Sequence, residues 1–177
     1  VNVSMVQFLH SDVPATVSRI LDDVGIDPAA LSLEITESVF EQESEHLLGQ
    51  MEALRALGVR LSLDDFGTGF SSLSHLRRYP FDEIKIDRSF VRDCTESDFS
   101  RGIIEMIIRL GSVLGASVVA EGVETAAQRD LLLQLGCQTG QGYFYSMPLT
   151  GEDFHWLLRS SGDLPLDQQE NVSELNS

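Results

Sequence analysis

The chain has 177 residues and a formal net charge of −16, because 28 aspartates and glutamates outnumber 12 lysines and arginines. This excess of negative charge argues against binding to polymeric nucleic acid or to an anionic membrane surface, since like charges repel. Hydrophobic residues make up 42% of the chain, which is ordinary for a globular domain with a sizeable core.

Short β-rich segments alternate with longer segments of helical periodicity. In chain order, the pattern predicts a strand at residues 1–4, a helix at 14–24, a strand at 31–36, a helix at 43–57, strands at 59–63 and 84–86, a helix at 100–114, a strand at 117–120, a helix at 125–135 and a strand at 142–145. Each predicted helix is followed by a glycine, which is a common helix stop. This order is typical of a parallel sheet covered by helices, either a barrel or a doubly wound sheet.

The last residues differ from the rest in composition. Residues 162–177 contain four acidic residues, no basic residue and few apolar ones. We therefore expect a domain over residues 1–161, followed by an acidic, disordered tail over residues 162–177.

The two cysteines and the longest apolar runs constrain the cellular compartment. Cys94 and Cys137 lie far apart without metal-ligand spacing, so we expect buried free thiols in a reducing cytoplasm. No apolar run approaches the ~20 residues that a membrane span needs, and no signal-peptide pattern opens the chain. We expect no membrane contact from this segment.

Carboxylates follow the predicted strands one after another, and a polar Asn2 lies in the first strand. The seven acids are Glu34, Glu37, Asp64, Asp65, Asp87, Glu121 and Glu124. Because the carboxyl ends of parallel strands share one face, these side chains should converge, and close carboxylates repel one another. A divalent cation with oxygen ligands removes that repulsion and lets an acidic protein bind a phosphate-bearing ligand. Glu37 or Glu124 taken alone is better explained as a helix cap or a solvated loop residue, but the whole set favours a metal site.

Lys85 lies between two isoleucines in the segment IKID, with Asp87 on the same side of the strand. In a metal site this lysine would orient a water molecule or neutralise a developing oxyanion, whereas a surface ion pair is the simpler alternative. Gly67 and Gly69 would let the loop after Asp65 move over a ligand, although ordinary turn chemistry explains them equally well.

Six segments resemble, in order and spacing, the motifs of EAL domains, which hydrolyse the bacterial second messenger cyclic di-GMP. The segments are VNVS, LSLEITES, LDDFGTGFSSL, IKIDRSFV, VVAEGVET and QGYFYSMPL, and the resemblance runs from residue 1 to about residue 158. It implies a (β/α)8 TIM-like barrel, here incomplete with about six strand–helix units. The Glu-Ala-Leu segment that names the family, whose glutamate ligates metal, is absent, as is the substrate-binding arginine near it. We therefore expect an excerpt of a larger protein or a truncated product, with open sheet edges that favour aggregation.

The resemblance also implies a site with two Mg²⁺ or Mn²⁺ ions and cleavage of the substrate to linear pGpG. The metal ligands would be Asn2, Glu34, Asp64 and Asp65, with Asp64 bridging both ions. Lys85 and Glu121 would hold the attacking water, with Glu121 as general base. The supporting residues would be Asp87 and Gln141, through hydrogen bonds, and Glu37, which would anchor the loop at residues 65–72.

Two alternatives stay open at the level of sequence. A non-hydrolysing cyclic di-GMP receptor or dimerisation module would account for the absent N-terminal glutamate, and another two-metal or enolase-like barrel would act on a different substrate. The resemblance further implies a homodimer, an upstream sensory or GGDEF domain, and a cytoplasmic location, either free or as the cytoplasmic part of a membrane-anchored protein.

Overall fold

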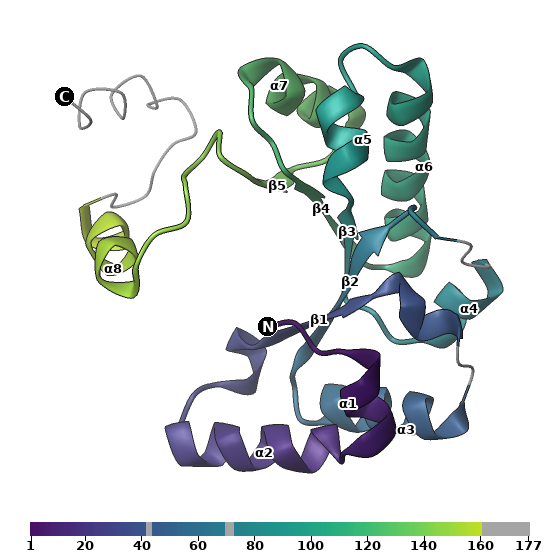
Figure 1. Ribbon diagram of the computed structural model, residues 1–177, viewed down its shortest axis with the longest axis vertical. Helices are drawn as coiled ribbons and strands as arrows, with labels where there is room; N and C mark the ends of the chain where they lie inside the picture. The colour runs from purple at the N-terminus through teal and green to yellow at the C-terminus, as the bar shows by residue number, and fades with distance from the viewer. Residues whose placement is uncertain (42–43, 70–72, 161–177) are drawn as a thin grey trace. The chain divides into compact units, whose positions relative to one another are not determined.

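The computed structural model describes residues 1–41, 44–69 and 73–160. Within these ranges a five-stranded parallel sheet runs in the order β1 to β5 (Figure 1). The strands are β1 (Ser32–Thr36), β2 (Arg60–Phe66), β3 (Glu83–Ile86), β4 (Ser117–Glu121) and β5 (Thr139–Gln141). All four neighbouring pairs are parallel, so the carboxyl ends of the strands lie at one edge, as the alternating sequence pattern predicts.

The predicted first strand contributes one bridge instead of a strand in the described chain. Asn2 pairs with Glu34 of β1 in parallel, through bonds of 2.9 Å from Val3 N to Glu34 O and of 2.8 Å from Glu34 N to Val1 O. The described chain thus provides five strands and this bridge in place of the six strands expected. The parallel arrangement with intervening helices is that of an incomplete (β/α) barrel.

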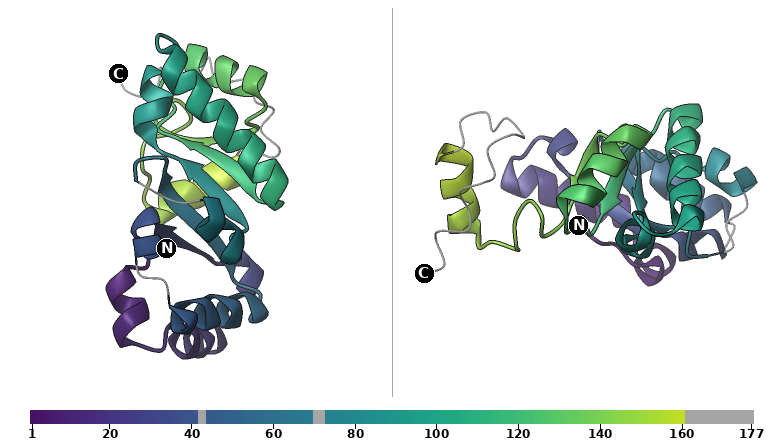
Figure 2. Two further views of the ribbon diagram at one scale, coloured as in Figure 1. Left: turned by 90° about the vertical axis from the view of Figure 1, so that its right-hand side faces the viewer. Right: turned by 90° about the horizontal axis from the view of Figure 1, so that it is seen from above.

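Helices connect the strands. They are α1 (Met5–His10), α2 (Val13–Val24), α3 (Glu45–Ala56), α4 (Leu73–Arg78), α5 (Arg88–Asp93), α6 (Asp98–Leu114), α7 (Ala126–Leu135) and α8 (Gly151–Ser160), with two short 3₁₀ turns, η1 (Pro28–Ala30) and η2 (Glu37–Glu41). Helix α3 packs on β2, and α6 packs on β3 and β4. Figure 2 shows the alternation of strand and helix from two further directions. The core consists mainly of Leu, Ile and Val side chains from β1 to β4 and from the inner faces of α3 and α6.

Local capping chemistry explains why the longer helices were predictable. The Asp12 carboxylate accepts a hydrogen bond from Ala15 N at the start of α2, and Thr125 caps α7 in the same way. Gly25, Gly115 and Gly136 end their helices in the left-handed conformation.

Two predicted strands are wrong in their bounds by three residues or more. The strand expected at residues 142–145 is a turn, and the neighbouring segment Thr139–Gln141 pairs with β4 instead. The turn is held by bonds from Phe144 N to Val123 O and from Tyr145 N to Gly142 O. β2 continues to Phe66, three residues beyond the predicted end, and α3 starts at Glu45 after a cap by Ser44. The predicted start of that helix, residue 43, lies outside the described residues.

The chain divides into two compact units, Val1–Tyr145 and a second that begins at Ser146 and contains α8. The predicted domain end at residue 161 stays a prediction, and the predicted tail lies outside the described residues. In the described chain, no helix combines the length and the apolar character that a membrane span requires. Both cysteines are buried and free, as predicted.

Candidate active site

The two adjacent carboxylates of β2 lie in an irregularity of the sheet. Leu63 pairs with Ile84 of β3, and Phe66 pairs with Ile86, so β2 uses three steps where β3 uses two. The extra residue forms a bulge at Asp64–Asp65, and Asp65 has a positive φ of 54°. In a regular strand neighbouring side chains point to opposite faces, whereas a bulge redirects them. One carboxylate oxygen each from Asp64, Asp65 and Glu121 consequently lie within 4.8 Å of one another.

Lys85 lies among the carboxylates of three strands. Its Nζ is 3.2 Å from Glu34 Oε1, 3.1 Å from Asp64 Oδ1 and 2.5 Å from Glu121 Oε1, and the residue is 4% exposed. Burial alone would lower the pKa of Lys85, but the hydrogen bonds and charges of Glu121 and Asp64 raise the pKa above its ordinary value. The lysine is therefore charged at neutral pH, and the surface ion-pair interpretation of Lys85 is wrong.

The site holds more negative charge than one lysine neutralises. Three carboxylates (Glu34, Asp64 and Glu121) pair with the one ammonium group of Lys85, and the Asp65 carboxylate lies beside Asp64 and Glu121, so the acidic groups outnumber the basic one. Burial, followed by the neighbouring carboxylates, raises the pKa of Asp65; burial raises the pKa of Glu121, opposed by Lys85. Asp64 Oδ1 is buried, and apart from the ion pair with Lys85 no hydrogen-bond donor in the described chain satisfies it. An oxygen-rich cluster of this kind fits hard divalent cations such as Mg²⁺ or Mn²⁺.

Glu37 is hydrogen-bonded to the loop that follows β2. The buried Glu37 carboxylate accepts hydrogen bonds of 3.1 Å from both Gly67 N and Gly69 N. A Cβ at position 69 would approach Glu37 Oε1 to 3.0 Å, so a glycine there permits the close contact. This geometry supports the predicted anchoring role for the described part of the loop, residues 65–69.

Asp87 and Gln141 lie beside the cluster. Asp87 caps α5 by accepting from Ser89 N at 2.9 Å and from the Ser89 hydroxyl, and its charge contributes to the raised pKa of Asp65. Burial opposes ionisation of Asp87, but the Ser89 hydrogen bonds lower its pKa. Gln141 Nε2 donates to Glu121 Oε1 at 2.8 Å. These contacts are compatible with the supporting roles that the resemblance implies.

The remaining predicted residues are less closely associated with the site. Asn2 is exposed and is placed next to Glu34 by backbone pairing. Glu124 is exposed in the segment after Glu121, outside the group of three converging carboxylates. Sequence reasoning missed Gln128, a buried side chain with backbone partners in two segments. The Thr-x-x-Gln pattern of a capping box, starting at Thr125, was the available signal.

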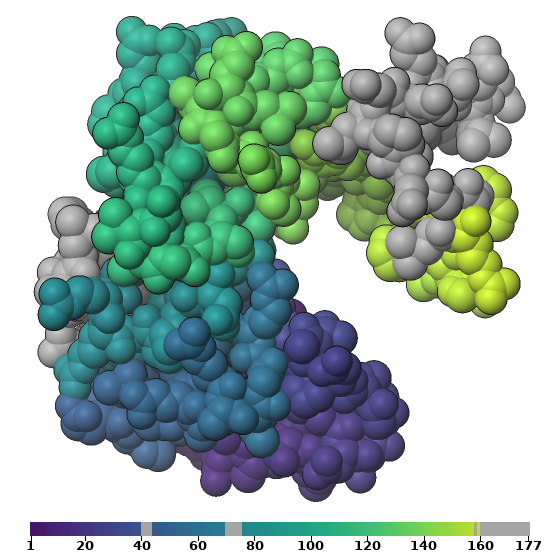
Figure 3. Space-filling view, turned by 180° about the vertical axis from the view of Figure 1, so that it is seen from behind, coloured from purple at the N-terminus to yellow at the C-terminus, as the bar shows by residue number. Residues whose placement is uncertain are grey.

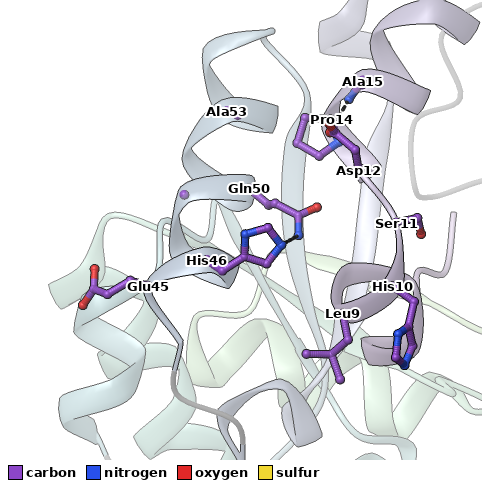
Figure 4. A pocket seen from close by; sticks show the side chains of 11 residues that line it. Leu9, His10, Ser11, Asp12, Pro14, Ala15, Glu45, His46, Gln50 and Ala53 are labelled. Carbon is purple, nitrogen blue, oxygen red and sulfur yellow. Dashed lines mark hydrogen bonds between the residues drawn. The ribbon is translucent and has the colours of Figure 1, made fainter.

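A cavity lies elsewhere in the first unit. It has a volume of about 780 Å³, is lined by residues of α1, α2, α3 and the turn between α1 and α2, and contains none of the predicted site residues (Figure 4). Gln50 and His46 are hydrogen-bonded there, with 2.9 Å between their side-chain nitrogens, and Gln50 Nε2 also donates to Phe8 O at 2.7 Å. These bonds tie α3 to the end of α1, which is a structural role.

Comparisons with known proteins agree with this geometry. The family model described as "EAL domain" matches residues 1–148. The chain is 41% identical over 152 residues to the bifunctional diguanylate cyclase/cyclic di-GMP phosphodiesterase MucR of Pseudomonas aeruginosa, covering 86% of this chain and 22% of MucR. The chain therefore spans about a fifth of the length of such curated relatives.

Two solved structures extend the likeness to three dimensions. The crystal structure of the EAL domain of Mycobacterium smegmatis DcpA superposes with a TM-score of 0.86 at 38% identity, covering 93% of this chain and 73% of that one. A manganese/cyclic di-GMP complex of Klebsiella pneumoniae BlrP1 gives a TM-score of 0.74 at 33% identity, covering 83% of this chain and 38% of that one.

Proposed function

The chain belongs to the EAL domain family, and we propose on that premise that it is part of a domain that hydrolyses cyclic di-GMP to linear pGpG with divalent metal ions. The observation that carries the proposal is the cluster of Glu34, Asp64, Asp65 and Glu121 around the buried Lys85. MucR and BlrP1 support the substrate, and BlrP1 supports a divalent metal.

The metal ligands in this proposal are Asn2, Glu34, Asp64 and Asp65. The bulge in β2 is what allows two consecutive residues to contribute a carboxylate to the same site. When bound, two Mg²⁺ or Mn²⁺ ions would neutralise the phosphate and stabilise the attacking and leaving oxygens of an in-line displacement.

The protein's own groups move the proton and hold the charge. Glu121 accepts a proton from the attacking water, whose oxygen forms a bond to phosphorus as the bond to the ribose 3′ oxygen breaks. The departing 3′ oxygen takes up a proton, so one water is consumed and one linear dinucleotide results. Gln141 orients the Glu121 carboxylate through its 2.8 Å hydrogen bond, and the charged Lys85 stabilises the negative charge that develops on phosphate oxygens.

The carboxylates present favour this enzyme over a receptor that binds without hydrolysis. Converging carboxylates provide ligands for the metal ions that hydrolysis needs, whereas a receptor that binds without hydrolysis needs no such ligands. Calorimetric titration with cyclic di-GMP, with and without Mn²⁺, separates the two, because tight metal-independent binding without product fits only a receptor.

Incubation of the chain with cyclic di-GMP and Mn²⁺, followed by ion-exchange chromatography, tests the proposal. We expect pGpG, its loss on chelation by EDTA, and no product from Glu121→Gln. Binding of both Mn²⁺ and cyclic di-GMP without pGpG, or undiminished turnover by Glu121→Gln, would contradict it.

We also propose that two copies of the chain associate through α6, on the surface of the first unit (Figure 3). Phe99, Met106 and Val113 recur every seven residues along α6 and are 72%, 48% and 83% exposed. The partly buried Ile103 and Leu110 lie between them, which completes the alternating spacing of four and three residues typical of a coiled-coil seam.

The charges of α6 suit a second copy. The helix carries two acidic residues (Asp98, Glu105) and two basic ones (Arg101, Arg109), so it is neutral within a chain of charge −16. Sedimentation velocity should show a dimer for the wild type and for Val24→Glu, an exposed control on α2, and a monomer for Met106→Glu. A monomeric wild type would contradict this association.

The wider context follows from the relatives. Because MucR is bifunctional and much longer than this chain, we propose that the full protein carries an upstream GGDEF or sensory domain. We propose a cytoplasmic location, where the cyclic di-GMP substrate would be available.

A further inference from the structure

Gln128 is a buried side chain in the first turn of α7 that bonds to three backbone groups. Its Oε1 accepts from Glu124 N at 2.8 Å and from Thr125 N at 3.0 Å, and its Nε2 donates to Arg92 O at 3.3 Å. The residue is 6% exposed. The bonds to Thr125 and Glu124 belong to an ordinary helix cap, but the bond to Arg92, 36 residues away in α5, is not part of a cap.

One side of this arrangement is the segment that directly follows Glu121. Residues 122–125 continue β4 into α7, and Val123 in their middle is fully buried. Val123 N donates to Gln141 O at 3.0 Å, and Val123 O accepts from Phe144 N at 2.9 Å. The segment therefore connects Glu121 with Gln141, whose side chain also bonds to the Glu121 carboxylate.

The other side is helix α5, which starts at the Asp87 cap and contains Arg92 near its end. Gly122 lies so close to this helix that a Cβ on it would come within 2.7 Å of Arg88 Cβ. Its φ of +68° also disfavours other residues. Gly122 and Gln128 thus hold the segment after Glu121 against α5 at two separate points.

We propose that Gln128 is a positioning residue for the hydrolytic site, fixing the segment after Glu121 against the helix that begins at Asp87. It sets the orientation of Glu121 relative to Lys85 and Gln141 without touching the reacting groups. This inference rests on the proposed phosphodiesterase function. Substitution of a residue that orients the groups of a metal site without touching the metal typically lowers activity or metal affinity by about 10- to 100-fold.

Two substitutions separate positioning from capping. Gln128→Glu keeps an acceptor for Glu124 N and Thr125 N but removes the donor to Arg92 O. Gln128→Leu removes all three bonds, so the Glu124 and Thr125 amides and the Arg92 carbonyl lose this partner. Gln134→Leu, at an exposed position of the same helix, is the matched control.

Steady-state kinetics with cyclic di-GMP and Mn²⁺ calorimetry provide the first test. We expect kcat to fall about tenfold in Gln128→Glu and about 100-fold in Gln128→Leu. KM and Mn²⁺ affinity should stay within about threefold, because neither variant alters a proposed metal ligand. Unchanged kcat in folded Gln128 variants, or equal losses in Gln134→Leu, would overturn the proposal.

Hydrogen exchange provides a test that needs no turnover. In Gln128→Leu we expect faster exchange both at residues 122–125 and in α5, whereas a simple cap would affect only the first turn of α7 and the two residues before it. Exchange confined to that turn would overturn the positioning role. Absence of turnover in the wild type, with the two-segment exchange pattern present, would instead count against the proposed function alone.

Discussion

The two ends of the parallel strands differ in how their acidic side chains are neutralised. At the amino ends, Asp82 and Glu83 face Arg55 and Arg60 at 3.5 and 3.9 Å, so two acids meet two bases. Asp82 also accepts from Leu61 N at 3.0 Å, and Glu83 accepts from the Ser62 hydroxyl at 2.9 Å. At the carboxyl ends, the carboxylates of Glu34, Asp64 and Glu121 all pair with Lys85, and the Asp65 carboxylate lies beside those of Asp64 and Glu121.

This difference distinguishes polar residues that stabilise the fold from residues that form a candidate binding site. Where the fold needs only solubility and register, charges are matched and hydrogen-bonded within the protein. Where negative charge is left in excess and partly buried, the free energy of folding is raised unless a cation enters. The contrast therefore supports the carboxyl end as the proposed cation site.

Removal of Lys85 should have the largest effect. Lys85→Met leaves its partly buried carboxylates without a counter-charge, so we expect turnover to fall about 10³-fold and metal-free stability to fall by about 3 kcal/mol. Arg60→Met at the other end should cost less than about 1 kcal/mol, because Arg60 is half exposed. Product chromatography and urea unfolding measure the two quantities. Turnover within tenfold of the wild type for Lys85→Met would show that the lysine is not part of the machinery.

The second-largest effect is expected on metal affinity, which should differ between substitutions at the carboxyl and amino ends of the strands. Asp64→Asn removes a proposed bridging ligand and should weaken Mn²⁺ binding about 100-fold or more. Asp82→Asn, the same chemical change at the amino end, should leave Mn²⁺ affinity unchanged. Isothermal titration of both variants decides, and equal losses would mean that Mn²⁺ responds to overall charge and not to this site.

Ligand linkage gives a smaller but general effect. A metal that binds only the folded chain adds about 2.7 kcal/mol of stability at 100 times its dissociation constant. Thermal unfolding with and without Mn²⁺ should show this gain in the wild type and in Asp82→Asn but not in Asp64→Asn. Stabilisation of all three proteins alike would place the bound metal elsewhere.

The amino end offers the smallest expected change. Glu83→Gln keeps an acceptor for the buried Ser62 hydroxyl and loses only a long, partly exposed ion pair. We expect a stability loss of at most about 1 kcal/mol in urea unfolding and no change in turnover. A large loss of turnover would contradict the conclusion that charges at the amino ends of the strands only stabilise the fold.

Local signals in the sequence predicted much of this fold. Helices with caps such as Asp12 and Thr125 were predicted within two residues of their observed starts, because a cap involves only neighbours in the chain. The convergence of Asp64 and Glu121 on Lys85 was also predictable, since parallel strands place their carboxyl ends together.

Features decided by distant partners were not predictable. The bulge at Asp64–Asp65 depends on the register with β3, and the paired aspartates suggested a strand end instead. The aromatic residues at 143–145 favoured a strand by propensity, yet bonds to Val123 make them a turn. Gln128 was missed because its distinguishing partner, Arg92, lies in another segment.

The positive φ of Asp65 sets a limit on how this protein can be made more robust. A non-glycine residue in that backbone region costs up to about 1–2 kcal/mol, although aspartate tolerates it better than most. A search for stabilising substitutions would therefore favour glycine at position 65, and it would lose a carboxylate from the site. At this residue thermostability and activity select for different amino acids, so selection for heat tolerance alone is expected to inactivate the site there first.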